Sequence, residues 1–397
     1  MVMVTDKKFD TAMLVGARPN FVKVAPLLNK FEENNLNVLF IHTGQHWDKN
    51  MSEDIFRDLG LREPDVNLNI QNKSMNQQLG SMIIELDKYL DDKSVDSLFV
   101  LGDVTSTLAG AITAKNNSIK CFHVEAGLRS GNLNMPEERN RMMVDTISDK
   151  LYTPSSHAVD NLIEENISIE KIKNVGNIMI DTLLRNYDEI VSEDNFEPSE
   201  FSIERDYFVL TLHRPTNLSD RNLEIIFSGI SEFTNNHDVL IPAHPRLKDF
   251  VDKNKIDTSR FKVIEPQPYI KFLGLVYNSE LCLTDSGGLQ EETTFLNKKC
   301  LTLREETERP ITVLKGTNKV IGVNKNILSV LYFICIYVLG IALILFSIVS
   351  MFSFAKTFFL SRVKFVEKRI NLDLVSGYLI ILVGLAYLSY NWSSHAH

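Results

Sequence analysis

Short apolar runs alternate with longer amphipathic segments from Thr11 to about Ile321. A few apolar residues in a row are typical of a strand that is buried on both faces, and amphipathic segments are typical of the helices that cover such strands. The alternation therefore predicts an α/β fold of βαβ units with parallel sheets. The predicted strands are Ala12–Val15, Val38–His42, Leu98–Leu101, Cys121–Val124, Phe208–Leu212, Val239–Pro242, Lys262–Ile264, Leu281–Thr284 and Cys300–Leu303.

The chain has 397 residues, which is more than one compact core usually contains, so we expect two doubly wound domains. Residues 189–205 are acidic, polar and weakly periodic, which is typical of an exposed linker. We therefore predict an N-terminal domain over residues 1–188 and a C-terminal domain over residues 206–326.

The end of the chain has a different composition. Residues 327–355 and 374–392 contain no charged side chain, and each span is long enough to cross ~30 Å of hydrocarbon as a helix. Core helices are seldom apolar on every side over such a length. We therefore predict a two-helix transmembrane hairpin over residues 327–397, which would attach the protein to a membrane through residues 327–392.

The orientation of this predicted hairpin raises a conflict. The loop between its spans contains the basic residues Lys356, Arg362, Lys364, Lys368 and Arg369. The positive-inside rule would keep this loop in the cytosol and place the preceding domains outside. Large domains without a signal are poorly translocated, so we expect the two preceding domains to be cytoplasmic. A fusion of these domains to an unrelated membrane fragment would explain the conflict equally well.

Composition excludes several functional classes. The net charge of -9, with no long basic stripe, argues against nucleic-acid binding. Cys121, Cys282, Cys300 and Cys335 are scattered without metal-ligand spacing, which predicts a reducing compartment and no structural zinc. The first eight residues show no charged region followed by an apolar one, so we expect no cleaved secretory signal.

Two carboxylates follow predicted strands directly. Glu125 comes after the run Cys121–Val124, and Asp103 comes after Leu98–Leu101. Because the carboxyl ends of parallel strands line the ligand crevice of an open sheet, these two groups are expected to meet there. Mutual repulsion would then raise the pKa of one of them, giving an acid beside a base. The alternative is that Asp103 caps a helix that starts near Thr105.

Several segments are suited to binding an anion. In the C-terminal half, Ser286, Gly287 and Gly288 follow a strand and open a helix, where backbone amides can approach a diphosphate. In the N-terminal half, Arg18 lies at the start of a helix and Lys23 follows about one turn later. His213 and His244 each end a strand with an arginine nearby, and histidine can transfer protons near neutral pH. Each of these signals has a plausible structural explanation when it is taken alone.

Taken together, these motifs resemble the non-hydrolysing UDP-N-acetylglucosamine 2-epimerases over residues from about 13 to 321. The resemblance rests on the following segments, which occur in the order of the family: Gly16-Ala17-Arg18-Pro19, His42-Thr43-Gly44-Gln45-His46, Gly102-Asp103, His123-Val124-Glu125-Ala126-Gly127-Leu128-Arg129, Pro136-Glu137-Glu138, His213-Arg214 and Asp285-Ser286-Gly287-Gly288. It implies the glycosyltransferase-B architecture, with two Rossmann-like domains and the sugar nucleotide between them. It also implies a homodimer that uses no metal and no nicotinamide cofactor.

The implied reaction interconverts UDP-N-acetylglucosamine and UDP-N-acetylmannosamine for surface polysaccharide synthesis. UDP is eliminated as the C2 proton leaves, and UDP then adds back while C2 is protonated on the other face. By matching position, the resemblance implies an acid–base set of Asp103, Glu125, Glu137 and His213. It implies a UDP site of Arg18, His244, Ser286, Gly287, Gly288 and Glu292, with Lys23 and Arg141 near the sugar or the diphosphate.

The chain also departs from the family, and this leaves other functions open. Asn20 stands where the family usually has Glu, and after Asn318 the chain enters the apolar tail where the family continues its second domain. One alternative is therefore a catalytically impaired UDP-sugar-binding module on a membrane anchor. Others are an epimerase of a UDP-diacetamido-uronic sugar, a hydrolysing epimerase, which Pro136-Glu137-Glu138 disfavours, and a glycosyltransferase of the same architecture.

Overall fold

The computed structural model describes residues 8–44, 55–70, 74–91, 93–192, 198–203, 206–214, 216–233, 237–242, 245–254 and 261–323. Met1–Leu328 form one compact unit, and Ser329–His397 form a second unit that lies outside the described residues, as does the predicted hairpin. None of the helices in the described ranges combines the length and the hydropathy that a membrane span requires.

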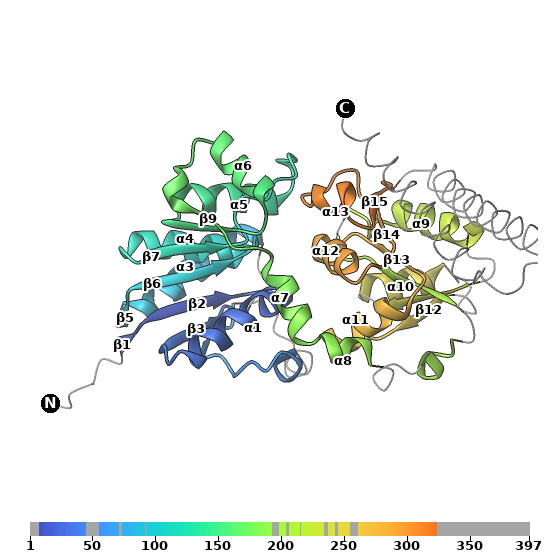
Figure 1. Cartoon of the computed structure of the whole chain (residues 1–397), viewed down its shortest axis with the longest axis horizontal. Helices are drawn as coiled ribbons and strands as arrows, with labels where there is room; N and C mark the ends of the chain where they lie inside the picture. Colours follow the sequence, from blue (N-terminus) through green and yellow to red (C-terminus); the bar gives the residue numbers. More distant parts are fainter. Residues whose placement is uncertain are drawn as a thin grey trace, which may run out of the picture. The chain divides into compact units, whose positions relative to one another are not determined.

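The first lobe, residues 8–174, is built on a parallel sheet of seven strands (Figure 1). The strand order is β4 (Val66–Asn67), β3 (Val38–His42), β2 (Thr11–Val15), β6 (Ser97–Leu101), β7 (Lys120–Val124), β8 (Lys150–Thr153) and β9 (Ile172–Asn174). Every residue of the central strands β2, β3 and β6 is buried, because helices cover both faces of the sheet. Those helices are α1 (Arg18–Glu33), α3 (Met75–Leu90), α4 (Thr105–Asn116), α5 (Pro136–Ile147) and α6 (Ser156–Glu164). The short strands β1 (Lys8–Phe9) and β5 (Ser94–Val95) pair separately.

The second lobe, residues 206–323, contains a parallel sheet of six strands. Their order is β12 (Phe261–Ile264), β11 (Asp238–Pro242), β10 (Tyr207–Thr211), β13 (Leu281–Thr284), β14 (Cys300–Thr302) and β15 (Asn318–Val320). The helices of this lobe are α9 (Asp220–Phe233), α10 (Pro245–Lys253), α11 (Tyr269–Asn278), α12 (Gly287–Phe295) and α13 (Pro310–Leu314). The sequence therefore predicted the α/β class and the parallel sheets correctly.

Two helices lie in sequence between the sheets. α7 (Ile178–Arg185) packs on both α1 and α12, and Thr182 donates a hydrogen bond to the carbonyl oxygen of Val22 at 2.6 Å. α8 (Tyr187–Val191) packs on α11, and a 3-10 turn follows at Pro198–Phe201. The division into domains at residues 189–205 stays a prediction.

All nine predicted strands are present, with ends shifted by at most one residue. The prediction omitted the separate pair β1 and β5, and in the two large sheets it omitted β4, β8, β9 and β15, of which β4, β9 and β15 are sheet edges. An edge strand is only partly covered, so it does not need a continuous apolar run. In β8 buried and more exposed residues alternate, so the apolar run that signals a central strand is absent.

Candidate active site

Two sharp turns carry the carboxylates at the carboxyl ends of β6 and β7. Gly102, with φ 68°, precedes Asp103, and Glu125 itself has φ 70°. A Cβ on Gly102 would stand 2.9 Å from the Nζ of Lys23 and 3.3 Å from Oε2 of Glu125. Only glycine fits this turn without strain, because the left-handed conformation and the close approach both disfavour a side chain. The turn therefore brings the backbone before Asp103 against the side chain of Glu125.

Glu125 is held by one cation from each lobe. Its side chain is buried, and Lys23 of α1 donates a hydrogen bond to its Oε2. Arg309 of the second lobe donates from Nη2 to Oε1 at 2.6 Å. A buried carboxylate needs such partners to remain charged. Glu125 thus lies between two cations at the point where the two lobes contact each other.

Asp103 forms an ion pair with Arg141 of α5. Burial by itself would raise the pKa of Asp103, but the positive charges of Arg141 and Lys23 hold this pKa below its usual value. Asp103 is therefore not the raised carboxyl that repulsion from Glu125 would produce. The alternative role as a helix cap is wrong, because Val104 is the N-cap residue of α4 and no side chain bonds to the free amides there.

The two glutamates at the start of α5 differ in their surroundings. Glu138 is 1% exposed and accepts hydrogen bonds from the amides of Ser130 at 3.0 Å and Gly131 at 2.9 Å. It also accepts from Nη1 of Arg141 at 2.9 Å. Glu137 is half-buried; burial and Arg304 lower the pKa of Arg214 in the second lobe, and Glu137 is one of the charges that partly oppose this lowering. Glu138 therefore holds the loop at Ser130 and Gly131 and orients Arg141. The charge of Glu137 interacts with Arg214 of the second lobe.

In the second lobe, Asp285 anchors the segment after β10. Its buried carboxylate accepts hydrogen bonds from the amides of His213 at 3.1 Å and Arg214 at 3.0 Å. Its Oδ1 also lies 2.8 Å from Nδ1 of His213. Burial would raise the pKa of Asp285, but the bonds to His213 lower it below its usual value. The His213 side chain is 56% exposed, so its other ring nitrogen is accessible for proton transfer.

The N-terminus of α12 differs in detail from the predicted phosphate cradle. Ser286 is the N-cap residue, and its Oγ accepts from the amide of Leu289 at 3.4 Å. A Cβ on Gly287 would stand 2.7 Å from Oε1 of Glu308, and one on Gly288 would stand 2.8 Å from the terminal methyl of Met179. The two glycines thus allow the close approach of protein side chains, and a diphosphate at this terminus would lie beside a carboxylate.

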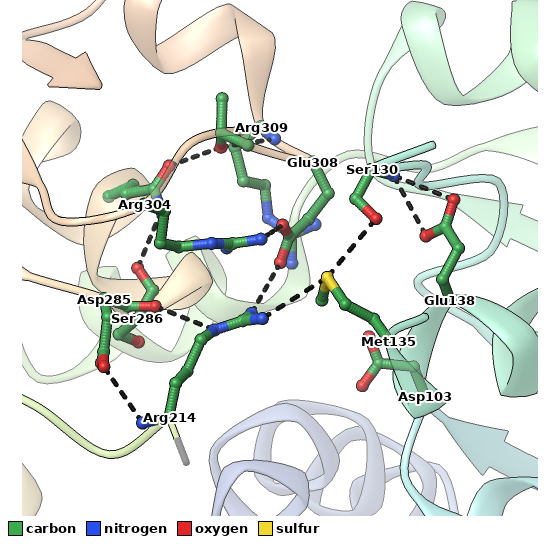
Figure 2. Close-up of polar contacts among 12 residues, drawn as sticks. Asp103, Ser130, Met135, Glu138, Arg214, Asp285, Ser286, Arg304, Glu308 and Arg309 are labelled. Atoms are coloured by element: carbon green, nitrogen blue, oxygen red, sulfur yellow. Dashed lines mark hydrogen bonds and ion pairs between the residues drawn. The ribbon is translucent and has the colours of Figure 1, made fainter. Parts of the chain in front are cut away.

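That carboxylate is surrounded by arginines. Nη2 of Arg304 lies 2.7 Å from Oε2 of Glu308, and Nη2 of Arg214 lies 3.6 Å from Oε1 (Figure 2). Burial would raise the pKa of Glu308, but Arg309 and Arg304 hold it far below its usual value. Figure 2 also shows Arg214 reaching Met135 of the first lobe, at 3.7 Å from Nη1 to Sδ. Guanidinium groups and a helix N-terminus are the groups that bind phosphates in proteins.

Glu292, one turn further along α12, is almost completely buried. Its Oε1 accepts a hydrogen bond from the hydroxyl of Tyr269 at 2.8 Å. Burial is the largest effect on this carboxyl and raises its pKa to about 7, although the bond from Tyr269 lowers it. In its ionised form Glu292 has free lone pairs that can accept hydrogen bonds from sugar hydroxyls.

The predictions missed the charged segment Arg304–Arg309. Besides binding Glu125, Arg309 lies 2.8 Å from Glu291, measured from Nε to Oε2. Burial lowers the pKa of Arg309, but Glu291 and Glu125 raise it overall, so the guanidinium is charged. The signal was present in the sequence, because this segment follows the buried strand β14 just as Glu125 follows β7. The side chain of Arg18 and the whole of His244 lie outside the described part of the chain, so their roles stay predictions.

Comparisons with known proteins bear on the identity of this site. The family model for UDP-N-acetylglucosamine 2-epimerase matches residues 29–331. The UDP-N-acetylglucosamine 2-epimerase of Methanocaldococcus jannaschii is 41% identical over 325 residues, which are 79% of this chain and 89% of that protein. The UDP-2,3-diacetamido-2,3-dideoxy-D-glucuronate 2-epimerase of Pseudomonas aeruginosa is 36% identical over 321 residues, which are 79% of this chain and 89% of that protein.

Solved structures give the same result. The crystal structure of the Methanocaldococcus jannaschii UDP-GlcNAc 2-epimerase in complex with UDP-GlcNAc and UDP aligns with a TM-score of 0.77 at 39% identity, covering 82% of this chain and 92% of that one. The Neisseria meningitidis UDP-GlcNAc 2-epimerase bound to UDP-GlcNAc aligns with a TM-score of 0.74 at 30% identity, covering 81% of this chain and 90% of that one. In sequence and in fold, the chain belongs to the UDP-N-acetylglucosamine 2-epimerase family.

Proposed function

We propose that the protein interconverts UDP-N-acetylglucosamine and UDP-N-acetylmannosamine. The observation that carries this proposal is the position of Glu125, which is bound by Lys23 of the first lobe and Arg309 of the second. An arginine of the second lobe thus adjoins a carboxylate of the first, as elimination of a diphosphate together with the C2 proton requires. The related enzyme from Methanocaldococcus jannaschii has been solved with UDP-GlcNAc and UDP. The product would supply precursors for a surface polysaccharide.

The reaction balances without a cofactor. In the first half, a base takes the C2 proton, the electron pair of that bond forms a double bond between C1 and C2, and the C1–O pair leaves with UDP. In the second half, a UDP oxygen adds to C1 while an acid protonates C2 on the opposite face. We assign the acid–base work to Asp103, Glu125, Glu137 and His213, without dividing it between the two halves. Positioned acids and bases typically contribute ~10²–10⁴-fold each to a rate.

The diphosphate needs a cationic site that stabilises it as it leaves. Arg214 and Arg304 flank the N-terminus of α12, where Ser286 caps the helix. We propose that they bind the diphosphate there, and that Glu292 accepts hydrogen bonds from the ribose. Preorganised positive groups of this kind stabilise charge that develops in the transition state. Arg18, His244, Gly287 and Gly288 complete the proposed UDP site, with Lys23 and Arg141 nearer to the sugar.

Further expectations complete the proposal. We propose two Rossmann-like domains over residues 1–188 and 206–326, a homodimer, a cytoplasmic catalytic part and attachment to the membrane through residues 327–392. A second substrate is favoured by one observation, the 36% identity to the diacetamido-glucuronate epimerase of Pseudomonas aeruginosa. That sugar differs from N-acetylglucosamine at C3 and C6 but has the same substituents at C1 and C2, where the bonds are broken and formed.

Proton NMR in deuterium oxide tests the function directly. The full chain, purified in a mild detergent, is incubated with UDP-N-acetylglucosamine or with the UDP-diacetamido-glucuronate in parallel. We expect deuterium at C2 and an epimeric product from the preferred substrate. Saturable UDP binding without exchange would instead indicate a binding module, and transfer of the sugar to an acceptor without C2 exchange would indicate a glycosyltransferase. Release of free N-acetylmannosamine would indicate the hydrolysing reaction.

A further inference from the structure

A buried ion pair lies beneath the two carboxylate turns of the first lobe. His123 of β7 and Asp145 of α5 are both 0% exposed. Nδ1 of the ring is 2.7 Å from Oδ1 of Asp145, and Nε2 is 2.8 Å from the carbonyl oxygen of Gly102. The other carboxylate oxygen of Asp145 accepts from the amide of Gly127 at 3.1 Å and lies 2.8 Å from Nη1 of Arg129. The pair is therefore bonded to the residue before Asp103 and to the second residue after Glu125.

The contacts fix one proton of the ring. A carbonyl oxygen cannot donate, so Nε2 must donate to Gly102. Asp145 receives two other donors, the Gly127 amide and Arg129, and although burial raises its pKa, His123 and Arg129 lower it overall. His123 is thus held between the Gly102 carbonyl and the carboxyl of Asp145 in the interior of the lobe.

Burying two charges costs more than filling the same space with apolar side chains, so the pair is weak evidence for stability alone. The contacts of the pair with Gly102 and Gly127 point to another role. Gly102 and Gly127 have φ 68° and 80°, and Glu125 between them has φ 70°. A side chain in that left-handed region costs about 1–2 kcal/mol and persists only where the surroundings hold it. One ion pair thus restrains both of the turns that carry acidic groups.

We propose that His123, paired with Asp145, is the positioning residue that sets Asp103 and Glu125 relative to each other for the epimerase reaction. This inference rests on the proposed function, since positioning has meaning only for the groups that react. The His123 side chain is 0% exposed, which leaves no surface for a substrate to contact. It acts by holding the Gly102 carbonyl and, through Asp145, the Gly127 amide. A displacement of about 1 Å at reacting groups can lower a rate by ~10²-fold.

The test compares His123→Gln with a matched control in the full chain. Ser148→Ala removes another fully buried polar group from the same contact between β7 and α5, where Ser148 Oγ lies 3.5 Å from Sγ of Cys121 and bonds to neither turn. We expect kcat to fall ~10²-fold in His123→Gln while KM and UDP affinity change by less than about threefold. The control should retain kcat within about threefold. Equal losses in the two variants, or a fall in kcat that follows the loss of folded protein, would overturn the proposal.

Two measurements do not depend on turnover, so they distinguish a failure of the positioning role from a failure of the proposed function. NMR of the chain labelled with nitrogen-15 histidine should show one histidine whose Nε2 carries a proton that is protected from solvent, and that signal should vanish in His123→Gln. Amide hydrogen exchange at residues 101–104 and 125–128 should accelerate in His123→Gln and not in Ser148→Ala. A His123 ring without a proton on Nε2, or unchanged exchange at both turns, would refute the positioning role even if the wild-type protein proved to be inactive.

Discussion

Replacing Glu292 with glutamine should stabilise the protein above pH 7 and have little effect at pH 5. The substitution keeps the shape of the side chain and the oxygen that accepts from Tyr269 at 2.8 Å. It removes the group whose pKa burial raises to about 7. The folded state holds a proton on Glu292 that the unfolded state releases between pH 4.5 and pH 7, where 4.5 is the ordinary pKa of the group. In that window the free energy of unfolding falls as the pH rises.

The magnitude follows from the two pKa values. The difference between about 7 in the folded state and 4.5 in the unfolded state corresponds to about 3 kcal/mol, at 1.36 kcal/mol for each pH unit. Ionisation of Glu292 therefore destabilises the wild-type protein by this amount above pH 7 and not at all below pH 4.5. The glutamine variant lacks this destabilisation at every pH. Any cost of placing the new amide among its neighbours is independent of pH, so the change with pH isolates the ionisation.

The assay is urea unfolding followed by far-ultraviolet circular dichroism at several pH values from 5 to 8. The free energy of unfolding of Glu292→Gln minus that of wild type should increase by about 2.5 kcal/mol across this range, because a small part of the effect is already present at pH 5. Tyr269→Phe should shift the transition to higher pH, because the hydrogen bond from Tyr269 lowers the pKa of Glu292. Glu280→Gln, on an exposed carboxyl of the same lobe, is the control and should show no such increase. An equal difference for Glu292→Gln at pH 5 and pH 8 would refute the reasoning.

Three further substitutions test the first lobe and its contact with the second. Glu125→Gln should abolish deuterium incorporation at C2 while UDP affinity, measured by calorimetry, changes by less than about threefold; an equal loss of binding would show a structural role. Gly102→Ala should lower the free energy of unfolding in urea by about 1–3 kcal/mol and also lower kcat, because φ is 68° and the new Cβ would stand 2.9 Å from Nζ of Lys23. The control is Gly80→Ala, where the new Cβ has nothing within 4 Å, and it should be neutral or stabilising by up to ~1 kcal/mol. Arg309→Met should lower the free energy of unfolding of the protein in urea by about 3–5 kcal/mol, because Glu125 loses its partner from the second lobe. A decrease below ~1 kcal/mol would mean that the contact between Arg309 and Glu125 is not maintained in solution.

The order of the strands and helices could be predicted from local patterns of apolar and polar residues. Each predicted strand is a run of apolar residues that both faces of a sheet cover, and this burial leaves a signal in consecutive residues such as Val38–His42. Edge strands such as β9 (Ile172–Asn174) were not found, since half-covered residues can be polar. The positions of Asp103 and Glu125 were also predictable, because parallel strands bring their carboxyl ends to one edge of the sheet.

The partners of these groups were not predictable from local pattern. Arg309 contacts Glu125 across 184 residues of sequence, and Lys23 does so across 102. No period or spacing encodes a contact between side chains that are so far apart in the chain. The same holds for His123 on β7 and Gly102 just after β6, which lie 21 residues apart in the sequence.

The sequence by itself determined the α/β class, the central strands, the turns that carry the carboxylates and the resemblance to the epimerase family, because each depends on residues that are close together in the chain. Only the tertiary structure decided how the charges are distributed. It paired Asp103 with Arg141, placed Glu125 between cations of both lobes and set Glu308 at the N-terminus of α12. Electrostatic energy depends on the distances between groups and on their burial, and both are properties of the packed chain.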